Sequence, residues 1–170
     1  MNVSAAYSIA EESQIKVTGR EPYRYKEKRV VQRYKQEYNK LLLFAFNYIP
    51  IQSILFKREL YDKMGGFDSK LDYLEDWDIW VRYSTIGEFA FVPTVTSKYF
   101  VPYRSKKKMQ RNRELEKASK SLKEKFKQYN ICMNLADINE EMEYVLYVHN
   151  KKGVYHYLKV IRDFILYRDM

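Results

Sequence analysis

The sequence of 170 residues is poor in cysteine, glycine and proline, with one, five and four of these residues. A single cysteine excludes an internal disulfide framework and a thiolate metal cluster. The longest apolar stretch, residues 41–56, is interrupted by polar residues and proline, and it is shorter than the ~20 apolar residues that a membrane-spanning helix needs. Residues 1–20 lack the apolar block of a signal peptide. We therefore expect one domain of ordinary size in the cytoplasm.

Aromatic residues and positive charge are abundant. The chain contains 17 tyrosines and nine phenylalanines, and its 46% hydrophobic content is too high for a disordered chain. Lysine and arginine number 31 against 22 acidic residues, which gives a net charge of +9. The positive charge is concentrated in residues 20–40 and 105–130. Such an excess indicates an anionic partner without identifying it.

The first 104 residues read as strands and short helices. Residues 3–10 have the small and apolar composition of a strand. The polar, tyrosine-rich residues 20–40 are interpreted as an exposed loop that leads into a helix ending near Phe46. The patterns then predict an extended segment, two helices and a strand, over residues 51–56, 58–64, 74–86 and 89–96.

The remaining residues, 105–170, change to an amphipathic helical pattern. A first helix has inward-facing residues at spacings of three and four, namely Leu115, Ala118, Leu122, Phe126 and Tyr129. Asp137 followed by Glu140 resembles a capping box that opens a second helix, and a third is predicted over residues 154–165. The lone Cys132 is expected to be a buried small hydrophobic side chain. The chain thus divides into residues 1–104 and a basic helical extension, residues 105–170.

The most informative motifs lie between residues 47 and 82. Asn47-Tyr48-Ile49-Pro50 is followed by the turn Gly65-Gly66-Phe67-Asp68, by the acidic cluster Glu75-Asp76-Trp77-Asp78, and by Arg82 one helical turn later. Carboxylates at a helix start are favoured by the helix dipole. By itself the cluster is more simply an ordinary acidic first turn, in which the Asp78–Arg82 pair contributes only ~0.3 kcal/mol; the surrounding motifs favour a functional role. Both interpretations stay open at this level.

The order and spacing of these motifs resemble the second half of the catalytic domain of family 2 glycosyltransferases. The resemblance covers residues 41–104 well and residues 1–40 loosely, and it does not extend to residues 105–170. It implies an α/β class: a partial type-A glycosyltransferase (Rossmann-like) fold with a mixed sheet, lacking the N-terminal nucleotide-binding half, plus a C-terminal helical appendage. It also implies sugar transfer from a nucleotide-diphosphate donor to a saccharide or lipid-linked acceptor, as in polysaccharide biosynthesis.

The resemblance assigns roles to individual residues. The family's general base, which takes the proton from the acceptor hydroxyl, matches Asp76. Glu75 and Asp78 would position the acceptor or brace the helix. Trp77 and Trp80 would either offer a flat face to a sugar or pack in the core, and the core is the simpler interpretation. Gly65 and Gly66 are interpreted as the ordinary stop of a helix, and backbone without side chains can also approach a sugar closely. The substrate-binding candidates therefore include Gly65 and Gly66, together with Asn47 and Arg82, which match the family's motifs.

Asp76-Trp77-Asp78 also spells the Asp-x-Asp sequence that holds a divalent cation in this family. We reject that role here, because the metal motif closes an apolar strand whereas a helical pattern follows this one. The chain contains no other Asp-x-Asp sequence. The Mg or Mn that the resemblance implies for the full-length enzyme is therefore expected to have its ligands outside this chain. Taken alone, the chain is expected to be inactive.

The basic run from Lys106 to Arg113 has two interpretations. It is either a solvated helix face or a peripheral contact with anionic lipid headgroups, where each basic residue contributes ~1 kcal/mol. No nucleic-acid-binding motif accompanies the charge, so we predict no nucleic acid partner. The alternative to the transferase is a non-catalytic basic module that binds an anionic surface or a partner protein.

Overall fold

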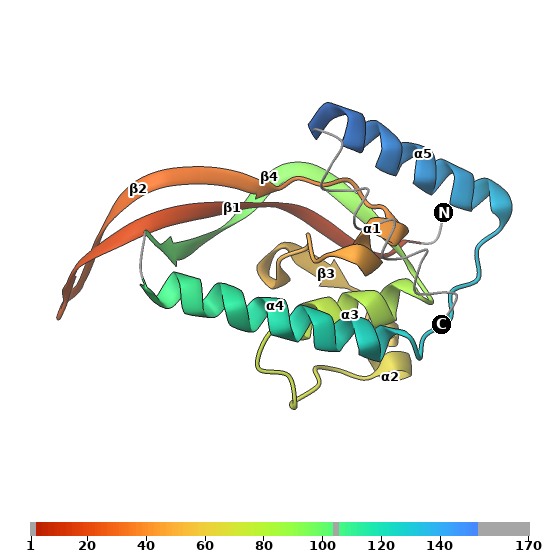
Figure 1. Ribbon diagram of the computed structural model, residues 1–170, viewed down its shortest axis with the longest axis horizontal. Helices are drawn as coiled ribbons and strands as arrows, with labels where there is room; N and C mark the ends of the chain where they lie inside the picture. Colours follow the sequence, from red (N-terminus) through yellow and green to blue (C-terminus); the bar gives the residue numbers. More distant parts are fainter. Residues whose placement is uncertain (1–2, 104–105, 153–170) are drawn as a thin grey trace.

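A computed structural model describes residues 3–103 and 106–152 of the chain. The fold is mixed α/β, with strands and helices that alternate irregularly along the sequence (Figure 1). The strands are β1 (Val3–Arg20), β2 (Tyr23–Tyr34), β3 (Ile54–Phe56) and β4 (Glu88–Pro102). The helices are α1 (Lys40–Ala45), the 3₁₀ turn η1 (Ile51–Ser53), α2 (Arg58–Met64), α3 (Glu75–Ser84), α4 (Lys106–Phe126) and α5 (Leu135–Lys152).

Strand β1 is the centre of a mixed sheet. It pairs with β2 and β3 in antiparallel orientation and with β4 in parallel orientation. Residues 5–7 pair with both β3 and β4, and residues 10–15 pair with both β2 and β4. Strand β4 therefore lines one edge of β1, while β3 and β2 follow one another along the other edge. The chain between β1 and the parallel β4 carries the motifs of residues 47–82.

The prediction of an exposed loop over residues 20–40 is wrong, because most of this segment is strand β2. Its residues are exposed on both faces as far as Val30, so the alternation of apolar and polar residues that marks a half-buried strand is missing. Strand β4 also extends beyond the predicted end at residue 96. Pro93 lies where the register between β1 and β4 shifts, between Val92 and Val95, which is the bend that the proline predicts.

The helix over residues 58–64 is confirmed, and Gly65 follows it with φ 76°. The hydrophobic core surrounds α3, whose Trp77, Trp80 and Tyr83 are fully buried. The C-terminal helices complete this core, since Leu122 of α4 and Val145 of α5 belong to the same cluster of buried side chains. Figure 1 shows α4 beside α3 and α5 on the far side of the sheet. Helices α4 and α5 therefore both contribute side chains to the core of the domain.

Two details of the C-terminal part correct the sequence analysis. Cys132 is exposed rather than buried, since it lies in the connection between α4 and α5. Helix α5 begins earlier than predicted, and Asn134 caps it by accepting a hydrogen bond from the backbone N–H of Asp137 (2.9 Å). The predicted helix over residues 154–165 and the side chains of Lys106 to Met109 lie outside the part of the chain described. Within that part, no helix is both long and apolar enough to cross a bilayer.

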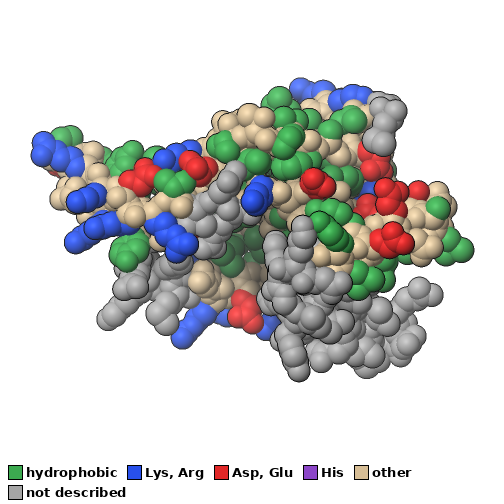
Figure 2. Space-filling view, turned by 90° about the horizontal axis from the view of Figure 1, so that it is seen from above, with side chains coloured by type: hydrophobic (Ala, Val, Ile, Leu, Met, Phe, Trp, Pro, Cys, Tyr) green, Lys and Arg blue, Asp and Glu red, His purple; other side chains and the backbone are tan. Residues whose placement is uncertain are grey.

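The outer half of the β1–β2 hairpin projects from the body and is called the arm here, residues 16–30. The ladder between β1 and β4 ends at Ile15 and Pro102, so the arm is a two-stranded ribbon. Every residue of the arm except Gly19 is exposed. Figure 1 shows the arm as the tapering end opposite α2 and α5, and Figure 2 shows Lys and Arg side chains gathered on it.

Candidate functional site

Asp76 lies in the first turn of α3, next to a strained residue. Leu74, which precedes the helix, has φ 62°, a left-handed conformation that costs a side-chain-bearing residue roughly 1–2 kcal/mol. The Asp76 Oδ1 atom accepts hydrogen bonds from Asn47 Nδ2 (3.0 Å) and from the backbone N–H of Trp77 (2.8 Å). Burial raises the pKa of the Asp76 carboxyl, the two hydrogen bonds partly oppose this rise, and the neighbouring Glu75 adds to it. No ion pair joins Asp76 to a lysine or arginine of the described chain.

Asn47 is held in place by its own backbone segment. Its Oδ1 atom accepts a hydrogen bond from the backbone N–H of Ile49 (3.2 Å), which directs the amide nitrogen toward Asp76. The indole Nε1 of Trp80 donates to the carbonyl of Ile49 (3.0 Å) and ties this segment to α3. The structure therefore brings together the Asn-x-x-Pro motif and the acidic cluster, which lie about thirty residues apart in sequence.

Asp78 and Arg82 form an internal brace. Asp78 is fully buried; its Oδ2 lies 3.0 Å from Arg82 Nε and its Oδ1 lies 2.8 Å from Lys125 Nζ of α4. The Arg82 guanidinium also donates to the backbone carbonyls of Met64, Gly65 (3.3 Å) and Gly66 (2.7 Å). Of the roles that the resemblance implies for Asp78, bracing the helix agrees with this geometry. The N–H groups with which Arg82 would bind a substrate are engaged in these hydrogen bonds to the glycine turn.

Trp77 and Trp80 are each only 1% exposed. The indole N–H of Trp77 donates to the carbonyl of Leu43 (2.6 Å), and the Phe126 ring of α4 packs edge-on against Trp77. Buried indoles with satisfied N–H groups are typical of a core. Neither ring presents a face to a ligand in this structure, which agrees with the simpler interpretation of the two tryptophans.

The glycine turn is explained by backbone geometry and packing. Gly65 has φ 76°, a conformation that residues with a Cβ rarely adopt. A Cβ at Gly66 would lie 2.6 Å from Cε2 of the Tyr61 ring, so this ring would have to move. The carbonyl of Gly65 also accepts a hydrogen bond from the Tyr83 hydroxyl (2.9 Å). The turn is thereby fixed to α3 by Tyr83 and Arg82.

Lys125 is a residue of this region that the sequence analysis did not single out. Its Nζ atom lies 2.8 Å from Asp68 Oδ2 of the glycine-turn motif and 2.8 Å from Asp78 Oδ1. Lys125 lowers the pKa of Asp68. Burial acts to lower the pKa of Lys125 itself, but the two carboxylates outweigh it and raise this pKa. Lys125 lies between the inward-facing Leu122 and Phe126 in sequence, and this position could have indicated an inward contact. It was missed because residues 105–130 contain ten basic residues.

The residues described do not fit the divalent cation that the resemblance implies. Within residues 3–103 and 106–152, no three histidine, cysteine or acidic side chains come together as a metal site. Both oxygens of Asp78 face cationic side chains, so Asp76 and Asp78 do not form a joint ligand pair. We therefore derive no step of the chemistry through a metal.

Comparison with known proteins found no matching family model and no matching curated protein. The structure is a mixed α/β domain in which the half-buried carboxylate of Asp76 is held by neutral donors. The nearby acids Asp68 and Asp78 are paired with cations.

Proposed function

We propose that the chain is the acceptor-side part of a family 2 glycosyltransferase catalytic domain, with the nucleotide-binding half outside these residues. Asp76 is the general base. The observation that carries this proposal is the contrast among the acids of the motifs. Asp68 and Asp78 are paired with Lys125 or Arg82, whereas Asp76 meets only the neutral donors Asn47 and the Trp77 N–H.

The environment of Asp76 suits proton abstraction. A base works best when its pKa lies near the working pH, and burial raises the pKa of this carboxyl from its ordinary low value. The hydrogen bonds from Asn47 and Trp77 both fall on Oδ1. We therefore assign proton acceptance to Oδ2, with Oδ1 serving to orient the group.

The proposed step is an inverting transfer. The acceptor hydroxyl gives its proton to Asp76 Oδ2 while its oxygen forms a bond to the anomeric carbon of the donor sugar. The bond from that carbon to the nucleotide diphosphate breaks, and the diphosphate leaves with the electron pair. Glu75, which is half-buried beside the base, is proposed to contact the acceptor, since its carboxylate can accept a hydrogen bond from a second sugar hydroxyl.

The test replaces Asp76 in a full-length enzyme that includes the nucleotide-binding half. Asp76→Asn keeps the hydrogen bond from Asn47 but removes the proton acceptor, so we expect turnover to fall by ~10²-fold or more. Asp72→Asn is the matched control, because Asp72 is an exposed acid four residues before Asp76. Sugar transfer is measured with a panel of nucleotide-sugar donors, and the melting temperature checks the fold. Equal turnover for Asp76→Asn and Asp72→Asn would discard the assignment.

A further inference from the structure

The arm carries positive charge that the fold itself does not use. It contains six lysines or arginines and two glutamates. Lys16 and Lys26 are directly opposite each other in the register between β1 and β2, and like charges in this position destabilise a strand pair. A two-stranded ribbon with both faces exposed is also only marginally stable. An anionic surface that neutralises these lysines would remove their repulsion and stabilise the two-stranded arm.

An apolar ridge follows one face of the same ribbon. The rings of Tyr23 and Tyr25 lie 6.1 Å apart, and the ring of Tyr25 lies 5.1 Å from that of Phe100 in β4. Val17 is the register partner of Tyr25 and adds an aliphatic side chain to the ridge. These four side chains are between 42% and 60% exposed. The ridge is therefore contiguous and accessible.

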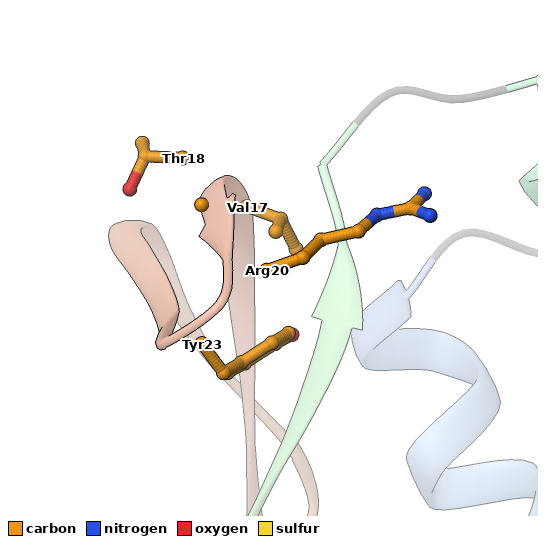
Figure 3. A pocket seen from close by; sticks show the side chains of 5 residues that line it. Val17, Thr18, Arg20 and Tyr23 are labelled. Carbon is orange, nitrogen blue, oxygen red and sulfur yellow. The ribbon is translucent and has the colours of Figure 1, made fainter.

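The tip of the arm combines this apolar character with a cation. A hollow of about 640 Å³ is lined by Val17, Thr18, Gly19, Arg20 and Tyr23. Figure 3 shows Val17, Arg20 and Tyr23 extending to the same side of the ribbon, whereas Thr18 points to the other side. A guanidinium beside aliphatic and aromatic side chains matches a phosphate group with hydrocarbon beneath it, since Arg binds phosphate oxygens through paired hydrogen bonds.

Charge and shape together distinguish between the occupants of this surface. A second copy of the chain would bring the same positive arm, and the two would repel each other. Single-stranded nucleic acid is bound by stacking successive bases on aromatic rings, but the rings here pack against one another at tilted angles of 46° and 48°. A bilayer has an anionic layer above an apolar one, where tyrosine concentrates and where the long stems of lysine and arginine reach the headgroups.

We propose that the tip of the arm docks onto a bilayer containing anionic phospholipids. Tyr23 and Val17 enter the interface, and Arg20 contacts a lipid phosphate in the hollow. Lys16 and Lys26 pair next to Val17 and Tyr25 and therefore lie on the other face of the ribbon, from which their long side chains reach the headgroups around the inserted tip. This surface is separate from the basic run of α4, and its action does not depend on the proposed catalysis.

The experiment measures sedimentation of the 170-residue chain with phosphatidylcholine vesicles, with and without phosphatidylserine. We expect binding only to the vesicles with phosphatidylserine. The double variant Arg20→Gln/Lys26→Gln should weaken this binding about thirtyfold, since each basic residue near the surface contributes ~1 kcal/mol. Tyr23→Ser should weaken it several-fold without any change of charge. These side chains are exposed, so the variants are expected to fold normally.

The matched control is Lys117→Gln/Lys120→Gln, which removes the same charge from exposed positions of α4. This control should bind vesicles nearly as well as the parent chain. Equal losses in the two double variants would mean that only net charge matters, and the proposal would be overturned. Binding to neutral vesicles, or tighter binding to single-stranded DNA than to the anionic vesicles, would overturn it as well.

Discussion

The motif-bearing body and the arm use the same charged residue types in opposite ways. In the body, Asp78 is fully buried and both of its oxygens face a cation, Arg82 or Lys125. In the arm, the cations are exposed, and two lysines face each other across the ribbon. Buried charges require fixed partners, whereas exposed charges keep their freedom. Charged side chains therefore fix the conformation of the body, whereas in the arm they form a charged surface.

The test with the largest expected effect on stability compares one arginine from each region. Arg82→Met removes one of the two cations that face the buried Asp78 and the donors to the glycine turn, and it should lower the free energy of unfolding by about 3–5 kcal/mol. Arg24→Met in the exposed arm should change it by no more than about 0.5 kcal/mol. Urea denaturation followed by tryptophan fluorescence measures both. Similar losses in the two variants would contradict the assignment of Arg82 as a brace.

A second test uses the opposite pKa shifts of one acid in each region. Burial raises the pKa of Asp76, so its charged form costs stability at neutral pH. This cost decreases as the pH falls from the raised pKa and is gone below the ordinary pKa of the unfolded chain. Asp76→Asn should therefore stabilise the chain by about 0.5–2 kcal/mol at neutral pH and by less in acid.

The matching arm variant should have the opposite sign. The nearby Ser13 side chain and then Lys98, whose Nζ donates to both carboxylate oxygens (3.1 Å), lower the pKa of Glu27, so the charged form of Glu27 stabilises the fold above its ordinary pKa. This contribution is lost as the pH falls through the lowered pKa. Glu27→Gln should therefore reduce stability at neutral pH and not in strong acid. Melting temperatures across a pH series check both variants, and slopes of the same sign would contradict this assignment.

The smallest expected effect lies within the arm. Lys16→Gln relieves the repulsion with Lys26 and should raise the free energy of unfolding by about 0.2–1 kcal/mol at low salt. Because salt screens exposed charges, the difference should shrink as the ionic strength rises. Chemical denaturation at two salt concentrations measures it. A stabilisation that is independent of salt would show that charge repulsion is not its cause.

Sequence patterns predicted those helices and strands that are determined by neighbouring residues. The helix over residues 58–64 ends where Gly65 takes a positive φ, and glycine is the usual residue for that conformation. The burial of Trp77 and Trp80 agrees with their helical spacing near other apolar residues. Strand β2 was missed because the arm buries neither face, and a strand without a buried face has no period-two pattern.

The contacts that define the candidate site could be predicted only in part. The motif order indicated that Asp76 and Asn47 belong to one site, and the structure places them in hydrogen-bond contact. The brace through Lys125 joins α4 to residues about fifty positions earlier. The sequence places this lysine beside the inward-facing Leu122 and Phe126, but which acids it pairs with is decided only when α4 packs on α3.

One further consequence follows from the length of β1. At ~3.3 Å per residue, its 18 residues give a continuous beam of about 60 Å that pairs with every other strand of the sheet. Its strand pairing runs from the residues beside β3 to the outer end, with register shifts at Ala10/Glu11, Gln14/Ile15 and Val17/Gly19. A contact that fixes the outer end of β1 therefore also restrains the distance and the orientation of Asp76 relative to the contacted surface.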